Sequence, residues 1–145
     1  MIYTDLTKKA MQLCFDAHKE QKDKSGLPYV FHPMHVAEQM QDEITTIVAL
    51  LHDVVEDTKY TLEDVREMGF SEEAVEAVSI LTKHRGLPEQ EYYDRIKKNQ
   101  IAKTVKLADL RHNSDLTRLN IIADETLAKC EKYKERIRFL EEDIV

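Results

Sequence analysis

The sequence predicts an all-α protein, and three observations lead to that fold class. The 145 residues include only three Gly and three Pro, so strong breaks between regular segments are few. Between these breaks, apolar residues recur at the three- and four-residue spacing of amphipathic helices. No hairpin dipeptide separates two alternating apolar runs. A chain of this length fits one domain with one core, residues 1–145.

The first third of the chain predicts three helices. Leu6 to Lys22 follows the amphipathic pattern, and the loop around Gly26 and Pro28 breaks it. Pro33 suits a first helical position, and the residues after it continue as helix. Residues 44–55 form the most apolar segment, whose Thr, Ile and Val content leaves a strand open although its length favours a helix.

Capping residues mark the next two helices. Thr61, with Asp64 three residues later, resembles a capping box that begins a short helix ending near Gly69. Ser71 caps the following helix over residues 72–83.

Three further helices complete the chain. Gly86 and Pro88 form a break, after which residues 89–98 and 101–119 show helical patterns. Asp124 is expected to cap a last, highly charged helix that runs through Ile144. The expected inner face of that helix consists of Leu127, Cys130, Ile137, Leu140 and Ile144.

Composition narrows the class of partner. Lys and Arg number 21 against 28 Asp and Glu, and a net charge of −7 argues against a nucleic-acid polymer. Cys14 and Cys130 are expected to be free thiols in a reducing cytosol. No signal peptide and no apolar run near the ~18 residues of a membrane span is visible, so we expect a cytoplasmic protein without a membrane partner. The last helix is a candidate partner surface, which leaves a homo-oligomer open.

Charged residues directly behind an apolar run raise the question of what they bind. His52 and Asp53 follow such a run, and an unpaired ion away from water costs several kcal/mol. His32 and Asp109 lie in similar apolar surroundings. Any one of these residues alone is more often structural, but together they offer two imidazoles and two carboxylates. This donor set suits Mn²⁺, Fe²⁺ or Zn²⁺ and lacks the thiolates of a structural zinc site.

Two further carboxylates follow on the same helical faces. Glu56 and Asp57 lie four residues after His52 and Asp53. Four protein ligands on an octahedral ion leave positions for water and substrate, and a nearby carboxylate can take or relay the proton. The residues therefore predict a metal-dependent hydrolase.

The order His32, His52-Asp53, Asp109 resembles the H…HD…D pattern of the HD-domain metal-dependent phosphohydrolases. The stretches AHKEQKDKSGLPYVFHPMHVAEQM, ALLHDVVEDT, TLEDV, LTK and VKLADLRHN resemble, in that order, the hydrolase domain of the Rel/Spo alarmone enzymes and the stand-alone small alarmone hydrolases. The resemblance implies an HD-type helical bundle, a Mn²⁺ ion and a small nucleotide substrate. It also implies hydrolysis of the 3′-pyrophosphate of ppGpp or pppGpp, which gives GDP or GTP and pyrophosphate, and a part in the stringent response.

The resemblance also assigns roles to residues of this sequence. The implied metal ligands are His32, His52, Asp53 and Asp109. Glu56 and Asp57 match the pair that acts on the water and the leaving group. Lys24 matches a basic residue of the substrate loop, and Asn113 matches the asparagine that contacts the sugar region of the nucleotide.

The chain departs from the family around the base. Asp23 stands where the family has an Arg that stacks on guanine, and an aspartate offers no planar cation. Residues 110–113 read Leu-Arg-His-Asn in place of Arg-Leu-His-Asn, and residues 114–116 also differ. Two alternatives therefore stay open: an enzyme for another nucleotide or phosphate ester, and a catalytically silent HD-fold binding domain. The intact Glu56 and Asp57 argue against the second.

Other polar and aromatic residues can be explained by structural roles. The basic run at residues 83–85 could meet phosphates at the cleft mouth or merely complement a helix dipole. His18 and His35 are expected to be packing or surface residues, and Tyr92 and Tyr93 to belong to the core.

Overall fold

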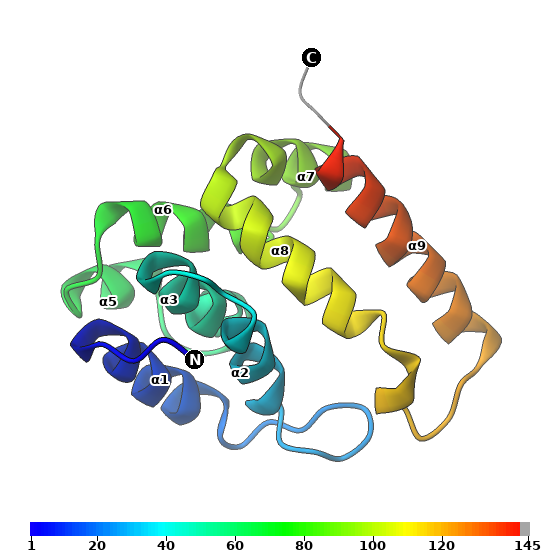
Figure 1. The fold of residues 1–145 in the computed structure, drawn as a ribbon, viewed down its shortest axis with the longest axis horizontal. Coiled ribbons are helices and arrows are strands. Elements are labelled where there is room, and N and C mark those ends of the chain that lie inside the picture. The colour runs from blue at the N-terminus through cyan, green and yellow to red at the C-terminus, as the bar shows by residue number, and fades with distance from the viewer. Residues whose placement is uncertain (143–145) are drawn as a thin grey trace.

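The computed structural model describes residues 1–142, which form helices joined by short loops (Figure 1). Within these residues there is no strand, only an isolated bridge between Lys22 and Pro28, and the predicted all-α class is confirmed. The helices are α1 (Asp5–His18), α2 (Phe31–Glu38), α3 (Glu43–Leu51), α4 (Val54–Asp57), α5 (Leu62–Glu67), α6 (Glu72–Leu81), α7 (Glu89–Lys98), α8 (Gln100–Asn113), the 3-10 turn η1 (Leu116–Arg118) and α9 (Asp124–Glu141).

Helix α3 lies at the centre of the bundle and packs against α1, α2, α6 and α8 (Figure 1). The Asp42 side chain caps it by accepting the backbone N–H of Thr45 at 2.9 Å. Every residue from Thr45 to Leu51 is buried, as expected for a helix that is apolar on all sides. The residues that follow α3 therefore start from a fixed, enclosed position.

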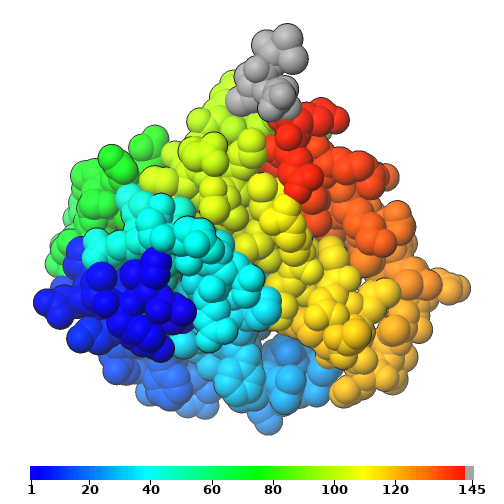
Figure 2. Space-filling view, viewed as in Figure 1, coloured from blue at the N-terminus to red at the C-terminus, as the bar shows by residue number. Residues whose placement is uncertain are grey.

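Helix α8 lies between this centre and α9. It packs on α2, α3, α6 and α7 and also carries α9, so it is covered along most of its length. Its outer surface is visible between α2 and α9 in the space-filling view (Figure 2). The arrangement brings α8 together with α2 and the end of α3, although α8 is far from both in the sequence.

Several helix ends differ from the predicted ones. The first helix ends at His18, where the buried ring bonds to the Gln21 side chain, and not near Lys22. The predicted helix 44–55 is broken between Leu51 and Val54.

The predicted helix 101–119 is also shorter than expected. It ends at Asn113, because the Ser114 hydroxyl donates to the Leu110 carbonyl and Asp115 caps the following 3-10 turn. The capping residues predicted for the fifth and sixth helices are confirmed, since Thr61 forms a capping box with Asp64 and Ser71 accepts the N–H of Ala74.

Helix α9 agrees with its predicted inner face only in part. Cys130 and Leu140 are buried, but Leu127 is 45% exposed, and Ile144 lies outside the described residues. Ala123, and not Asp124, occupies the position before the helix. Cys130 and Cys14 are both buried free thiols.

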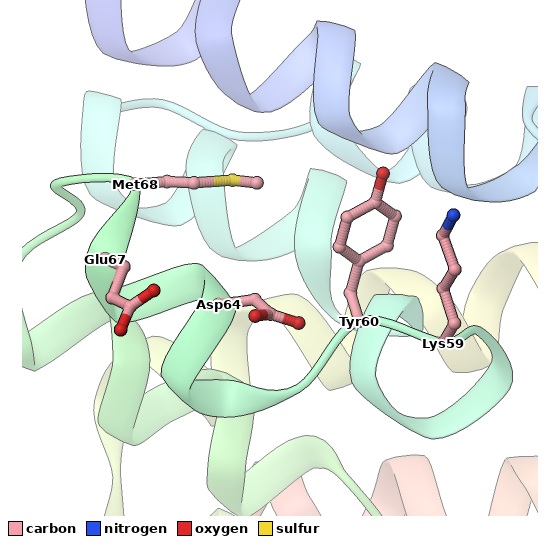
Figure 3. A pocket seen from close by; sticks show the side chains of 5 residues that line it. All are labelled: Lys59, Tyr60, Asp64, Glu67 and Met68. Carbon is pink, nitrogen blue, oxygen red and sulfur yellow. The ribbon is translucent and has the colours of Figure 1, made fainter.

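A cavity of about 300 Å³ lies near α5, and none of the predicted site residues lines it (Figure 3). It is lined by Lys59, Tyr60, Asp64, Glu67 and Met68, and the Lys59 and Tyr60 side chains project toward α1. In residues 1–142, no helix combines the length and the apolar character needed to cross a membrane.

Candidate functional site

His52 follows the last residue of α3 and is 3% exposed. Its Nδ1 donates to the Ala49 carbonyl at 2.5 Å. This hydrogen bond places the proton on Nδ1 and leaves a lone pair on Nε2 in the neutral ring. The Nε2 atom is buried and has no hydrogen-bond partner among the described residues. A buried nitrogen in this state is suited to bind a cation.

Asp53 shares the break between α3 and α4 with His52. In an uninterrupted helix, successive side chains point about 100° apart. Here the Asp53 Oδ2 atom lies 3.1 Å from His52 Nε2, so the two neighbours reach the same point. The hydroxyl of Tyr29 donates a short hydrogen bond to the same oxygen. The break that the sequence pattern did not predict is what lets both residues converge.

His32 on α2 and Asp109 on α8 complete the cluster. His32 Nε2 lies 2.7 Å from Asp109 Oδ1, which is itself 3.5 Å from His52 Nε2. The other ring nitrogen of His32 hydrogen-bonds to Nδ1 of His112 at 2.7 Å. The donor atoms of His32, His52 and Asp109 lie within 4.8 Å of one another, and all three residues are buried.

The donors of this cluster fit a divalent transition metal. Two imidazole nitrogens and two carboxylates form the mixed nitrogen and oxygen set that such ions accept. The Nε2 atom of His52 supports the fit, because this buried atom makes no hydrogen bond among the described residues and faces the carboxylates of Asp53 and Asp109 at 3.1 and 3.5 Å, an arrangement that a shared cation would satisfy.

Buried charges at the cluster are balanced by neighbours. Burial alone would raise the pKa of Asp109, but Lys106, at 3.0 Å from Oδ2, and the two histidines lower it well below its usual value. Burial would lower the pKa of His52, but Asp53 and Asp109 raise it well above its usual value, so these carboxylates favour a positive charge at Nε2, which either a proton or a bound metal cation supplies. Asp109 is therefore held ionised and ready to act as a ligand.

Glu56 and Asp57 lie on α4 beside the cluster, and each offers an oxygen within 4.8 Å of an Asp53 oxygen. The Glu56 Oε1 atom accepts the backbone N–H of Lys83. Burial raises the pKa of Glu56, and burial together with the Asp53 charge raises that of Asp57. Both carboxyl groups are exposed enough to meet a ligand. Their raised pKa values are shifted toward neutral pH, which suits proton transfer.

Lys24 and Asn113 line one cavity of about 590 Å³. Tyr29 lines the same cavity, which connects it to the cluster through the Tyr29–Asp53 hydrogen bond. Asn113 also donates to Asp109 Oδ1 at 3.2 Å. Lys24 is exposed, and its pKa is lowered by a second ammonium group, that of Lys129 on α9.

Asp23 also lines this cavity, but its carboxylate is committed to its own loop. The Oδ1 atom accepts the backbone N–H groups of Ser25 at 2.9 Å and Leu27 at 3.0 Å. Gly26, at φ +86°, lies between them in the left-handed region that glycine tolerates. Asp23 thus shapes the loop and offers no planar cation on which a base could stack.

Sequence reasoning missed several residues that touch the cluster or the cavity. They are Tyr29, Lys106, His112, Arg118, Lys129 and Tyr133. Lys106 had a visible signal, since it lies three residues before Asp109 and shares its helix face. Arg118, Lys129 and Tyr133 follow the predicted motifs and could be found only from the fold.

The histidines and tyrosines that were expected to be packing or surface residues have those positions. His18 is fully buried against Tyr29, and His35 is an exposed residue that stacks on His112. Tyr92 and Tyr93 are core residues. The basic run at residues 83–85 is exposed in the loop beside Glu56.

Comparisons with known proteins point to one family. The family model described as "HD domain" matches residues 10–134. Mouse guanosine-3′,5′-bis(diphosphate) 3′-pyrophosphohydrolase MESH1 is 40% identical over 124 residues, covering 72% of this chain and 66% of that protein. The bifunctional (p)ppGpp synthase/hydrolase SpoT of Escherichia coli K12 is 38% identical over 120 residues, 73% of this chain.

The chain spans only part of its long bacterial relatives. It covers 17% of E. coli SpoT and 11% of the guanosine-3′,5′-bis(diphosphate) 3′-pyrophosphohydrolase of Aquifex aeolicus, to which it is 40% identical over 79 residues, 52% of this chain. A solved structure, described as a metazoan ortholog of SpoT that hydrolyzes ppGpp and plays a role in starvation responses, matches with a TM-score of 0.79 at 26% identity. That match covers 97% of this chain and 87% of the other.

Proposed function

Because the chain belongs to the HD-domain family, we propose that it is a metal-dependent phosphohydrolase that removes the 3′-pyrophosphate of ppGpp and pppGpp. The observation that carries the proposal is the convergence of His32, His52 and Asp109 around the unpartnered Nε2 of His52, beside a pair of carboxyl groups. Relatives that are named for this reaction, at 38–40% identity, support the choice of substrate.

The proposed metal ligands are His32, His52, Asp53 and Asp109, and the proposed ion is Mn²⁺. The two imidazole donors support a transition metal over Ca²⁺ or Mg²⁺, and the resemblance to the alarmone hydrolases supports manganese among the transition metals. When bound, the ion would lower the pKa of a coordinated water and stabilise negative charge on the phosphate.

Glu56 and Asp57 would carry the proton transfers. The Glu56 oxygen that does not bind Lys83 is free to accept the proton of the attacking water. Asp57, whose pKa is raised, would supply a proton to the departing 3′-oxygen of the nucleotide. Water thus adds to the phosphorus and the bond to the 3′-oxygen breaks, which yields pyrophosphate with GDP from ppGpp, or with GTP from pppGpp.

The cavity lined by Lys24 and Asn113 would hold the nucleoside. Its volume of about 590 Å³ is in the range of small-molecule sites, and Asn113 lies next to Asp109. The engaged carboxylate of Asp23 favours a second candidate function, namely hydrolysis of another nucleotide or phosphate ester.

Four further proposals concern the domain, its partner, its location and its pathway. We propose that residues 1–145 form one HD-type hydrolase domain, as the family match over residues 10–134 supports. We also propose that its partner is a small nucleotide and no nucleic-acid polymer, that it acts in the cytoplasm, and that it takes part in the stringent response.

A substrate panel tests the proposal. The purified protein is incubated with Mn²⁺ and ppGpp, pppGpp or a set of nucleoside mono-, di- and triphosphates, and released phosphate and pyrophosphate are measured separately. Pyrophosphate from ppGpp and pppGpp alone is the expected result. Phosphate from monophosphates would favour the second candidate, and metal binding without any turnover would favour a silent binding domain.

A further inference from the structure

Lys106 is a partly buried cation beside the metal cluster. It lies on α8 one turn before Asp109, and its side chain is 16% exposed. Its ammonium group lies 5.4 Å from the ring centre of Tyr92 and 5.9 Å from that of Tyr93. Both tyrosines are core residues of α7, so the lysine is enclosed by aromatic faces that favour a cation.

The two oxygens of Asp109 have different partners. Oδ2 pairs with Lys106 Nζ at 3.0 Å. Oδ1 faces the two imidazoles, at 2.7 Å from His32 and 3.5 Å from His52. The carboxylate is therefore oriented, with one oxygen directed to the cluster and the other held away from it.

Burying a charged lysine side chain costs free energy unless the charge is paired. The aromatic faces and the carboxylate together offset that cost. A carboxylate left free to rotate could offer both oxygens to one cation and so occupy a coordination position that water or substrate needs.

We propose that Lys106 is a positioning residue that holds Asp109 so that it binds the cation through Oδ1 alone. This inference rests on the proposed function, because it requires the metal. It assigns a role to a residue outside the ligand set and outside the pair of acids. In this role Lys106 acts through Asp109.

Metal affinity tests the inference without reference to turnover. Mn²⁺ is titrated into the protein and into Lys106→Met by calorimetry, with folding checked by circular dichroism. Losing an outer partner of a ligand typically weakens metal binding about 10- to 100-fold, and that loss is expected here. Lys103→Met, three residues earlier on α8, removes the same charge at a half-buried position and is expected to bind Mn²⁺ as tightly as the parent.

A second variant and a second readout keep the test decisive. Lys106→Gln, which keeps a polar group but no charge, is used if the methionine variant does not fold, with the same expected loss. A crystal structure of the Mn²⁺-loaded variant should show Asp109 rotated or bound through both oxygens. Unchanged affinity with an unrotated Asp109 would overturn the role of Lys106 alone. A parent protein that binds no Mn²⁺ would overturn both this inference and the proposed function.

Discussion

The substitution Glu56→Gln separates metal binding from chemistry. The amide keeps the shape of the carboxylate, and its Oε1 atom can still accept the N–H of Lys83. Glu56 lies within 4.8 Å of an Asp53 oxygen but is not one of the four proposed ligands, so the variant should bind Mn²⁺ with the affinity of the parent. An amide cannot accept a proton from water at neutral pH, so the proposed base is lost.

The size of the effect follows from that role. General-base catalysis contributes about 10²- to 10⁴-fold, so kcat should fall by this factor, equivalent to about 2.7–5.4 kcal/mol in the activation barrier. Initial rates of pyrophosphate release from ppGpp at saturating substrate give kcat. Calorimetric titration with Mn²⁺ gives the metal affinity of the same preparation.

The control is Glu38→Gln, which makes the same change at an exposed position of α2. It should retain full turnover and metal affinity. A Glu56→Gln enzyme with parental kcat would refute the role of Glu56 as the base. If Glu56→Gln instead lost the metal, the assignment of the ligands would be incomplete.

Three further predictions use independent measurements. Asp53→Ala should lose both bound Mn²⁺, measured by elemental analysis, and pyrophosphate release, whereas retained metal would remove Asp53 from the ligand set. Leu50→Ala empties a fully buried position of α3 and should cost about 2–5 kcal/mol in urea unfolding, with a smaller loss indicating local collapse. Burial, assisted by Asp53, raises the pKa of Cys14 to about 12, so the thiol stays protonated from pH 7 to 9. The reaction of Cys14 with a thiol reagent should therefore stay slow across that pH range until the protein is denatured. A reaction rate that rises with pH in the folded protein would contradict the raised pKa.

The helical class could be predicted because periodicity and capping residues are local signals. Thr61 and Ser71 cap their helices as predicted. The ends near His18 and Asn113 could not be predicted, because they depend on a side-chain contact to Gln21 and on the Ser114 hydroxyl. In the sequence, the apolar pattern continues past each of these helix ends, and neither contact can be recognised there.

The candidate site also combines residues that the sequence could predict with residues that only the fold reveals. The convergence of His32, His52 and Asp109 agrees with the prediction, which came from polar residues in apolar surroundings. The roles assigned to them stay predictions. The residues of α9 that line the cavity, such as Lys129, escaped notice because only the packing of α9 on α8 brings them there.

The break between α3 and α4 has a consequence for the stability of the whole chain. A cation held at His52 and Asp53 would also join α2, through His32, and α8, through Asp109, and so connect segments that separate on unfolding. Folding and metal uptake would then be thermodynamically linked. A free Mn²⁺ concentration 100 times the dissociation constant would add about 2.7 kcal/mol to the free energy of unfolding. The melting temperature should therefore follow the metal supply and fall when a chelator removes it.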